Sequence, residues 1–60
     1  MSSREYYRQE LAACETVAEL ETISFELERK IREAFADDPG RIEWELEQLR
    51  QAAEEKGKDI

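Results

Sequence analysis

The sequence predicts an all-α fold, an antiparallel helical hairpin made of one long helix and one shorter helix. Its 60 residues include only two glycines and one proline, which leaves few positions that favour turns. The apolar residues recur at spacings of three and four, the period of an amphipathic helix. No repeat or linker divides the chain, so we expect residues 1–60 to form a single small helical domain.

The first helix is predicted over residues 3–36. Ser2 and Glu5 have the spacing of a capping box, in which the serine hydroxyl accepts a hydrogen bond from the amide three residues later. Met1 and Tyr6 occupy the two positions of a hydrophobic staple around that cap. These residues indicate that the helix begins near Ser3.

The second helix is predicted over residues 39–56. Asp38 followed by Pro39 is typical of an N-cap and the first helical position, so the preceding helix must end by residue 36. Gly57 is expected to stop the second helix in the left-handed conformation that glycine favours. The apolar stripe of this helix consists of Ile42, Leu46, Leu49 and Ala53.

The first helix carries two apolar stripes rather than one. The first stripe comprises Tyr6, Ala13, Val17, Leu20, Leu27, Ile31 and Phe35, with Ile23 and Ala34 at its edge. The second comprises Tyr7, Leu11, Cys14, Ala18 and Phe25, displaced by roughly 140° around the helix. A continuous helix of about 50 Å would present one stripe to its hairpin partner and the other to another chain.

The alternative is a three-helix bundle with a break near residues 14–16. Thr16 and Glu19 form a second capping-box match, which supports a helix start at that point. The segment offers no glycine, proline or asparagine to make the turn, so we favour the continuous helix.

A second apolar stripe predicts a homodimer, in which two hairpins form a four-helix bundle. A chain of this length buries only about 60% of the surface that it exposes when unfolded, and self-association adds to that burial. The residues expected at the dimer or partner interface are Tyr7, Leu11, Cys14, Phe25 and Trp44. In size and layout such a dimer resembles the plasmid copy-number Rop proteins, although no residue motif of that family is present, and the resemblance suggests a helical regulator.

The residue types present argue against catalysis. Histidine is absent, which removes the commonest general base and the usual partner of a nucleophilic serine or cysteine. Cys14 has no cationic neighbour in the sequence and is expected to be a small buried residue. The many carboxylates follow helical spacings that suit surface ion pairs rather than a calcium loop. We therefore predict no enzyme activity, no cofactor and no metal site.

The formal charge of -7 argues against direct binding to nucleic acid or to an anionic membrane surface. No signal peptide is recognisable and the single thiol suits a reducing compartment, so a cytoplasmic location is expected. We predict an interaction module that binds another protein through apolar helix faces, as an adaptor, inhibitor or small subunit. The alternative is an acidic nucleic-acid mimic, such as a phage-encoded anti-defence protein, that blocks a basic protein.

Overall fold

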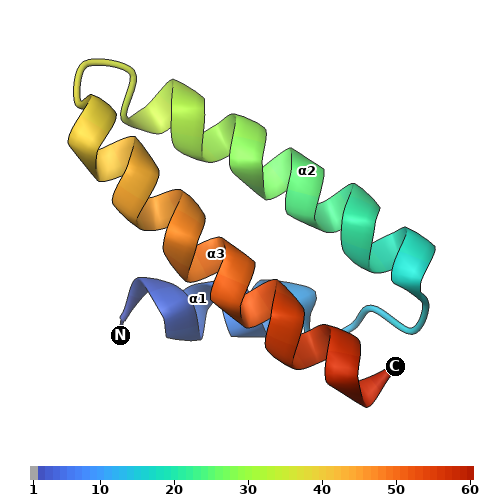
Figure 1. The fold of residues 1–60 in the computed structure, drawn as a ribbon. Coiled ribbons are helices and arrows are strands. Elements are labelled where there is room, and N and C mark those ends of the chain that lie inside the picture. The colour runs from blue at the N-terminus through green and yellow to red at the C-terminus, as the bar shows by residue number, and fades with distance from the viewer. Residues whose placement is uncertain (1) are drawn as a thin grey trace.

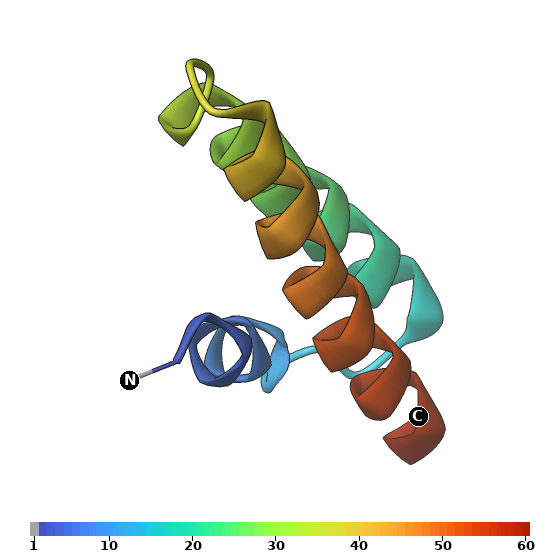
Figure 2. The same ribbon diagram turned by 60° about the vertical axis from the view of Figure 1, so that its left-hand side comes forward.

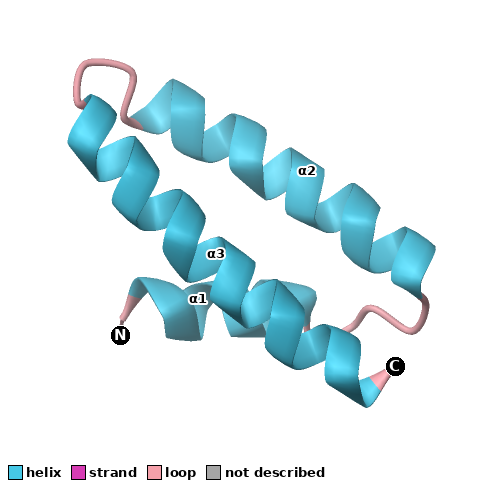
Figure 3. Cartoon of the chain, viewed as in Figure 1, coloured by secondary structure: helices cyan, strands magenta, loops and turns pink. Residues whose placement is uncertain are grey.

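The computed structural model describes residues 2–60 and contains three helices (Figures 1 and 3). They are α1 (Ser3–Leu11), α2 (Val17–Ala34) and α3 (Pro39–Asp59). No strand occurs among the described residues, so the all-α prediction is confirmed. Met1, and with it the proposed hydrophobic staple, lies outside the described part of the chain.

Each helix begins at a side-chain cap that the sequence indicates. The Ser2 hydroxyl accepts a hydrogen bond from the Glu5 amide at 3.2 Å, and the Thr16 hydroxyl accepts one from the Glu19 amide at 3.1 Å. At the start of α3, a carboxylate oxygen of Asp38 accepts from the amide at position 41, and proline fills the first turn. These caps satisfy amides that have no partner within the helix.

The prediction of a continuous helix over residues 3–36 is wrong, and the three-helix alternative fits the structure. The chain leaves α1 after Leu11, crosses residues 12–16 and enters α2 at Val17. Thr16 has the extended backbone of an N-cap, with φ -130° and ψ 161°. The phase shift between the two apolar stripes marks this break, because Tyr7 and Leu11, buried residues of the second stripe, lie in α1, whereas the buried residues of the first stripe lie in α2.

The helices α2 and α3 lie side by side and antiparallel, and α1 crosses α3 obliquely (Figures 1 and 2). Most contacts of α1 are made with α3, and fewest with α2. The N-terminal end of α1 points away from α2, as Figure 2 shows. This arrangement leaves an opening between α1 and the C-terminal half of α2.

The core lies where the three helices meet. Its buried apolar residues are Tyr7, Leu11, Cys14, Leu20, Leu27, Ile31, Leu49 and Ala52. Gly57 does not stop α3 as expected, because the helix continues to Asp59 and no glycine among the described residues has a positive φ. A Cβ built on Gly57 would lie 3.8 Å from Leu20, an ordinary contact, so the glycine is part of the packing between α2 and α3. Within residues 2–60, no helix has the length and apolar character needed to cross a bilayer.

Candidate functional site

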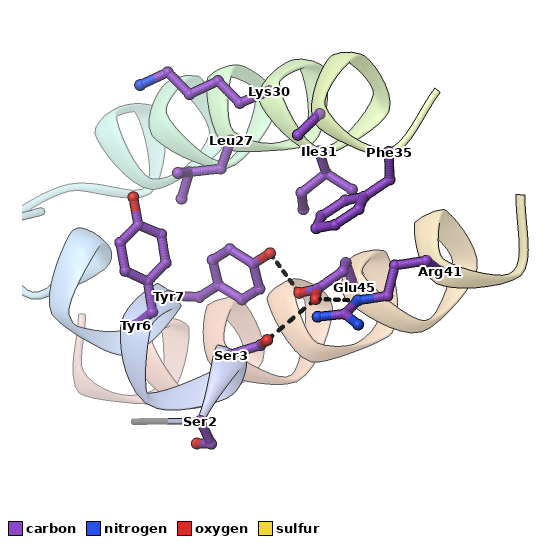
Figure 4. Close-up of a pocket in the computed structure, with 11 residues that line it drawn as sticks. Ser2, Ser3, Tyr6, Tyr7, Leu27, Lys30, Ile31, Phe35, Arg41 and Glu45 are labelled. Atoms are coloured by element: carbon purple, nitrogen blue, oxygen red, sulfur yellow. Dashed lines mark hydrogen bonds and ion pairs between the residues drawn. The ribbon is translucent and has the colours of Figure 1, made fainter. Parts of the chain in front are cut away.

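A buried carboxylate lies where α1 meets α3. Glu45 is only 2% exposed and accepts three side-chain hydrogen bonds (Figure 4). One of its oxygens accepts from the Tyr7 hydroxyl at 2.7 Å, and the other accepts from the Ser3 hydroxyl at 3.1 Å and from Arg41 Nε at 2.7 Å. Two of these donors come from α1, so the carboxylate holds the first helix against the third.

The three donors keep the Glu45 carboxylate ionised despite its burial. Burial by itself favours the neutral acid, but the hydrogen bonds from Tyr7, Arg41 and Ser3 and the charge of Arg41 outweigh it, and the pKa of Glu45 lies below its ordinary value. Burial and the hydrogen bond to Glu45 raise the pKa of Tyr7, which keeps its hydroxyl protonated as a donor. The group is therefore suited to anchor a helix rather than to exchange protons.

An open pocket adjoins this carboxylate, between α1 and the C-terminal half of α2. Its volume is about 470 Å³, and we call it the α1–α2 pocket. Apolar and aromatic side chains from α1, α2 and the C-cap of α2 project toward it, as Figure 4 shows for Tyr6, Leu27 and Phe35, whereas α3 contributes the charged Arg41 and Glu45. The residues that line it are Ser2, Ser3, Tyr6, Tyr7, Leu27, Lys30, Ile31, Ala34, Phe35, Arg41 and Glu45.

An arginine stacked against two aromatic rings forms one side of the pocket. The Arg41 guanidinium carbon lies 5.0 Å from the centroid of Phe35 and 5.4 Å from that of Trp44. Both distances are within the range of cation–π attraction. Arg41 Nε also donates a hydrogen bond to Glu45, so both the two rings and this carboxylate hold the guanidinium in place. Tyr6 and Trp44 remain 45% and 50% exposed, so the aromatic surface is accessible beside the pocket.

The structure separates the five residues that were expected at an interface. Tyr7, Leu11 and Cys14 are buried in the core of the single chain, because the break at residues 12–16 folds their stripe onto α3. Trp44 and Phe25 are exposed, the latter at 62%. Trp44 stacks on Arg41 next to the α1–α2 pocket, whereas Phe25 is outside the pocket lining.

Sequence reasoning missed Glu45, Arg41 and Tyr6 as site residues. A signal for Glu45 was present, because it lies three residues after Ile42 and four before Leu49, on the buried side of α3. An acidic residue at that position needs donors when it is buried. Arg41, four residues earlier, was the nearest candidate.

The described residues offer few other chemical groups. Among residues 2–60, no group of three histidine, cysteine, aspartate or glutamate side chains is arranged so that it could hold a metal ion. The one cysteine, Cys14, is a free thiol in the core. The site is therefore a surface of apolar and aromatic groups with two cations, Lys30 and Arg41, among its lining residues.

Comparison of the chain with known protein families, with curated proteins and with solved structures finds no match.

Proposed function

We propose that this chain is a small, non-enzymatic interaction module that binds another protein at the α1–α2 pocket, as an adaptor, inhibitor or small subunit. The observation that carries the proposal is the exposed aromatic and cationic surface formed by Tyr6, Arg41 and Trp44 at that pocket, where the half-buried ring of Phe35 supports Arg41. Tyrosine, tryptophan and arginine are the residues most enriched among those that dominate binding energy at protein interfaces.

The pocket favours a partner that brings an apolar side chain with an acidic flank. Its floor is mainly apolar, and Arg41 places a cation at its side although the chain as a whole carries -7, whereas the amino group of Lys30 points away from the pocket (Figure 4). Arg41 is held in place by Glu45 and by two rings, so little side-chain freedom is left to lose when a partner binds.

The test compares two exposed aromatic residues. Trp44→Ala removes a ring that stacks on Arg41, which lines the pocket. Phe25→Ala is the matched control because Phe25 is exposed, does not line the pocket and is not one of the two rings against Arg41. Tagged wild-type and variant proteins are incubated with extract of the source cells, and captured proteins are quantified by mass spectrometry. We expect a specific partner that Trp44→Ala retains at least about tenfold less, as for a hot-spot residue, while Phe25→Ala retains it fully.

Salt separates this proposal from the nucleic-acid-mimic alternative. A complex anchored by aromatic contacts should survive about 1 M salt, at which the Debye length is about 3 Å. A complex formed by the acidic surface alone should dissociate under the same conditions. Equal retention by both variants together with loss in high salt would contradict the pocket proposal and favour the mimic.

A further inference from the structure

The link between α1 and α2 is made of residues that suit a helix. Residues 12–16 contain neither glycine nor proline, and no described residue of the chain has a positive φ. Ala12 already has helical angles, with φ -60° and ψ -32°, and the Cys14 amide still donates to the Leu11 carbonyl at 3.1 Å. Straightening the link into a helix would therefore require no strained backbone conformation.

Most contacts of α1 are made with α3, which is distant in sequence, and few with α2, which follows it. Besides the bonds to Glu45, Arg4 donates to Gln51 at 2.9 Å and Arg8 forms an ion pair with Glu55 at 2.7 Å. Contacts between α1 and α2 are the fewest of any helix pair. The α1–α3 contacts would be kept if α3 were supplied by another copy of the chain.

A straight link would prevent α1 from reaching its own α3. In a continuous helix, the side of α1 that carries Tyr7 and Leu11 is turned by roughly 140° from the side of α2 that packs on α3. The apolar side of α1 would then face away from its own hairpin, and a second copy would have to cover it.

We infer that two copies of this chain form a dimer by exchanging α1. In the exchanged form residues 3–34 make one continuous helix, and α1 of each copy packs on α3 of the other with the same hydrogen bonds and ion pair. Domain exchange reuses existing contacts, so its balance depends mainly on the link. The inference does not rest on the α1–α2 pocket or on its proposed partner.

Two substitutions in the link should change the dimer dissociation constant in opposite directions. The Thr16 hydroxyl caps α2 only in the monomer, where the helix is interrupted at residues 12–16. Thr16→Ala should therefore make each monomer roughly fivefold less favourable and leave the exchanged dimer unaffected. Because two monomers form one dimer, the dimer dissociation constant should fall about thirtyfold. Glu15→Pro opposes a continuous helix and should raise that constant at least about hundredfold. Thr22→Ala, the same change within α2, should leave it unchanged.

These constants are measured by sedimentation equilibrium, after annealing from denaturant so that exchange can occur. Circular dichroism of Glu15→Pro establishes that its helices still form. If the wild type and Thr16→Ala both remain monomeric at millimolar concentration, the inference is wrong. It is also wrong if Thr16→Ala and Thr22→Ala change dimerisation equally.

Charge reversal identifies which copy supplies α3. Arg8→Glu and Glu55→Arg each place like charges across the α1–α3 contact of a single chain. When the two variants are annealed together, exchange pairs opposite charges at both contacts, so native mass spectrometry should find more mixed dimer than the statistical proportion. A mixed dimer at or below that proportion would show that α1 stays on its own chain.

Discussion

The contact between α1 and α3 combines side-chain hydrogen bonds with buried residues such as Tyr7 and Leu11. The contact between α2 and α3 is built from aliphatic side chains. Glu45, Gln51 and Glu55 on α3 all accept hydrogen bonds from α1. Within residues 2–60, no side-chain hydrogen bond joins α2 to α3, where Leu46 and Leu49 pack instead. The polar contact is directional and responds to pH, and the aliphatic contact depends on buried area alone.

This difference separates the roles of the helices. The α2–α3 hairpin is joined by a short turn and by non-directional packing, and we expect it to stay folded when α1 detaches. The helix α1 is attached through specific donors and acceptors, so its attachment can be weakened by changes that leave the hairpin intact. The α1–α2 pocket lies at the boundary between these two parts and depends on the position of α1.

Glu45→Ala is expected to have one of the two largest effects on stability. It leaves the buried Tyr7 hydroxyl without its acceptor and removes the link from Ser3 and Arg41, which should lower the free energy of unfolding by about 2–4 kcal/mol. Urea denaturation followed by circular dichroism measures this loss. Hydrogen exchange should show that amides of α1 lose protection before those of α2 and α3.

The matched variant for the aliphatic contact is Leu49→Ala, which should cost about 2–5 kcal/mol through lost burial and the cavity left behind. Its loss of hydrogen-exchange protection should spread over α2 and α3 as well as α1. If Glu45→Ala weakened all three helices to the same extent, the division into a stable hairpin and a separately attached helix would be wrong.

Lowering the pH should weaken the contact between α1 and α3 before it weakens the contact between α2 and α3. The pKa of Glu45 is lower in the folded chain than in the unfolded chain, so its stabilising contribution is complete above the ordinary glutamate value of 4.5 and is lost as the pH falls through the folded value. We expect the unfolding free energy of the wild type to decrease steadily below about pH 5. Stability measured by urea denaturation across this range tests the slope.

Two controls assign that slope to the buried carboxylate. Glu45→Gln cannot ionise and should be less pH-dependent than the wild type, whereas Leu49→Ala should keep the full slope. Glu47 also has a lowered pKa, about 2, because Arg50 donates hydrogen bonds to it. That pair is exposed, so high salt should reduce its contribution and leave the part due to Glu45. A slope that Glu45→Gln leaves unchanged would contradict this assignment.

Local sequence signals predicted the helix N-caps and the helical secondary structure, but not how the helices pack together. The caps at Ser2, Thr16 and Asp38 could be found because each depends on residues within one turn. The continuous helix was favoured over the break near residues 14–16 because no turn-forming residue marks that break. Only packing on α3 makes the bend favourable. The phase shift between the stripes on either side of Cys14 was visible, but it fits either a bend or a second chain.

The pocket could not be predicted for a related reason. Its lining comes from three helices, and which side chains meet there depends on the direction of α1 across α3. Trp44 was expected at an interface, and it is exposed and stacks on Arg41, three residues earlier on α3, while Phe35 reaches the same arginine from the end of α2. Phe25 was expected at the same interface and lies outside the pocket lining.

The smallest expected effect on stability concerns a polar group within the aliphatic contact between α2 and α3. The Ser24 hydroxyl is buried near Leu46 and Leu49 and has no hydrogen-bond partner among the described residues. A buried hydroxyl without a partner has lost its bonds to water, and serine is also a poorer helix former than alanine. Ser24→Ala should therefore raise the unfolding free energy by about 1 kcal/mol in urea denaturation.

Thr22→Ala is the control for Ser24→Ala, since Thr22 is exposed and donates to the Ala18 carbonyl at 3.0 Å within the same helix. It should change stability by less than Ser24→Ala does, because no buried polar group is removed. A loss of stability in Ser24→Ala would mean that the hydroxyl has a partner in solution and that α2 and α3 share a polar contact after all. A gain would show that the same kind of group is unfavourable between α2 and α3 and stabilising between α1 and α3, where Ser3 has the Glu45 carboxylate as its acceptor.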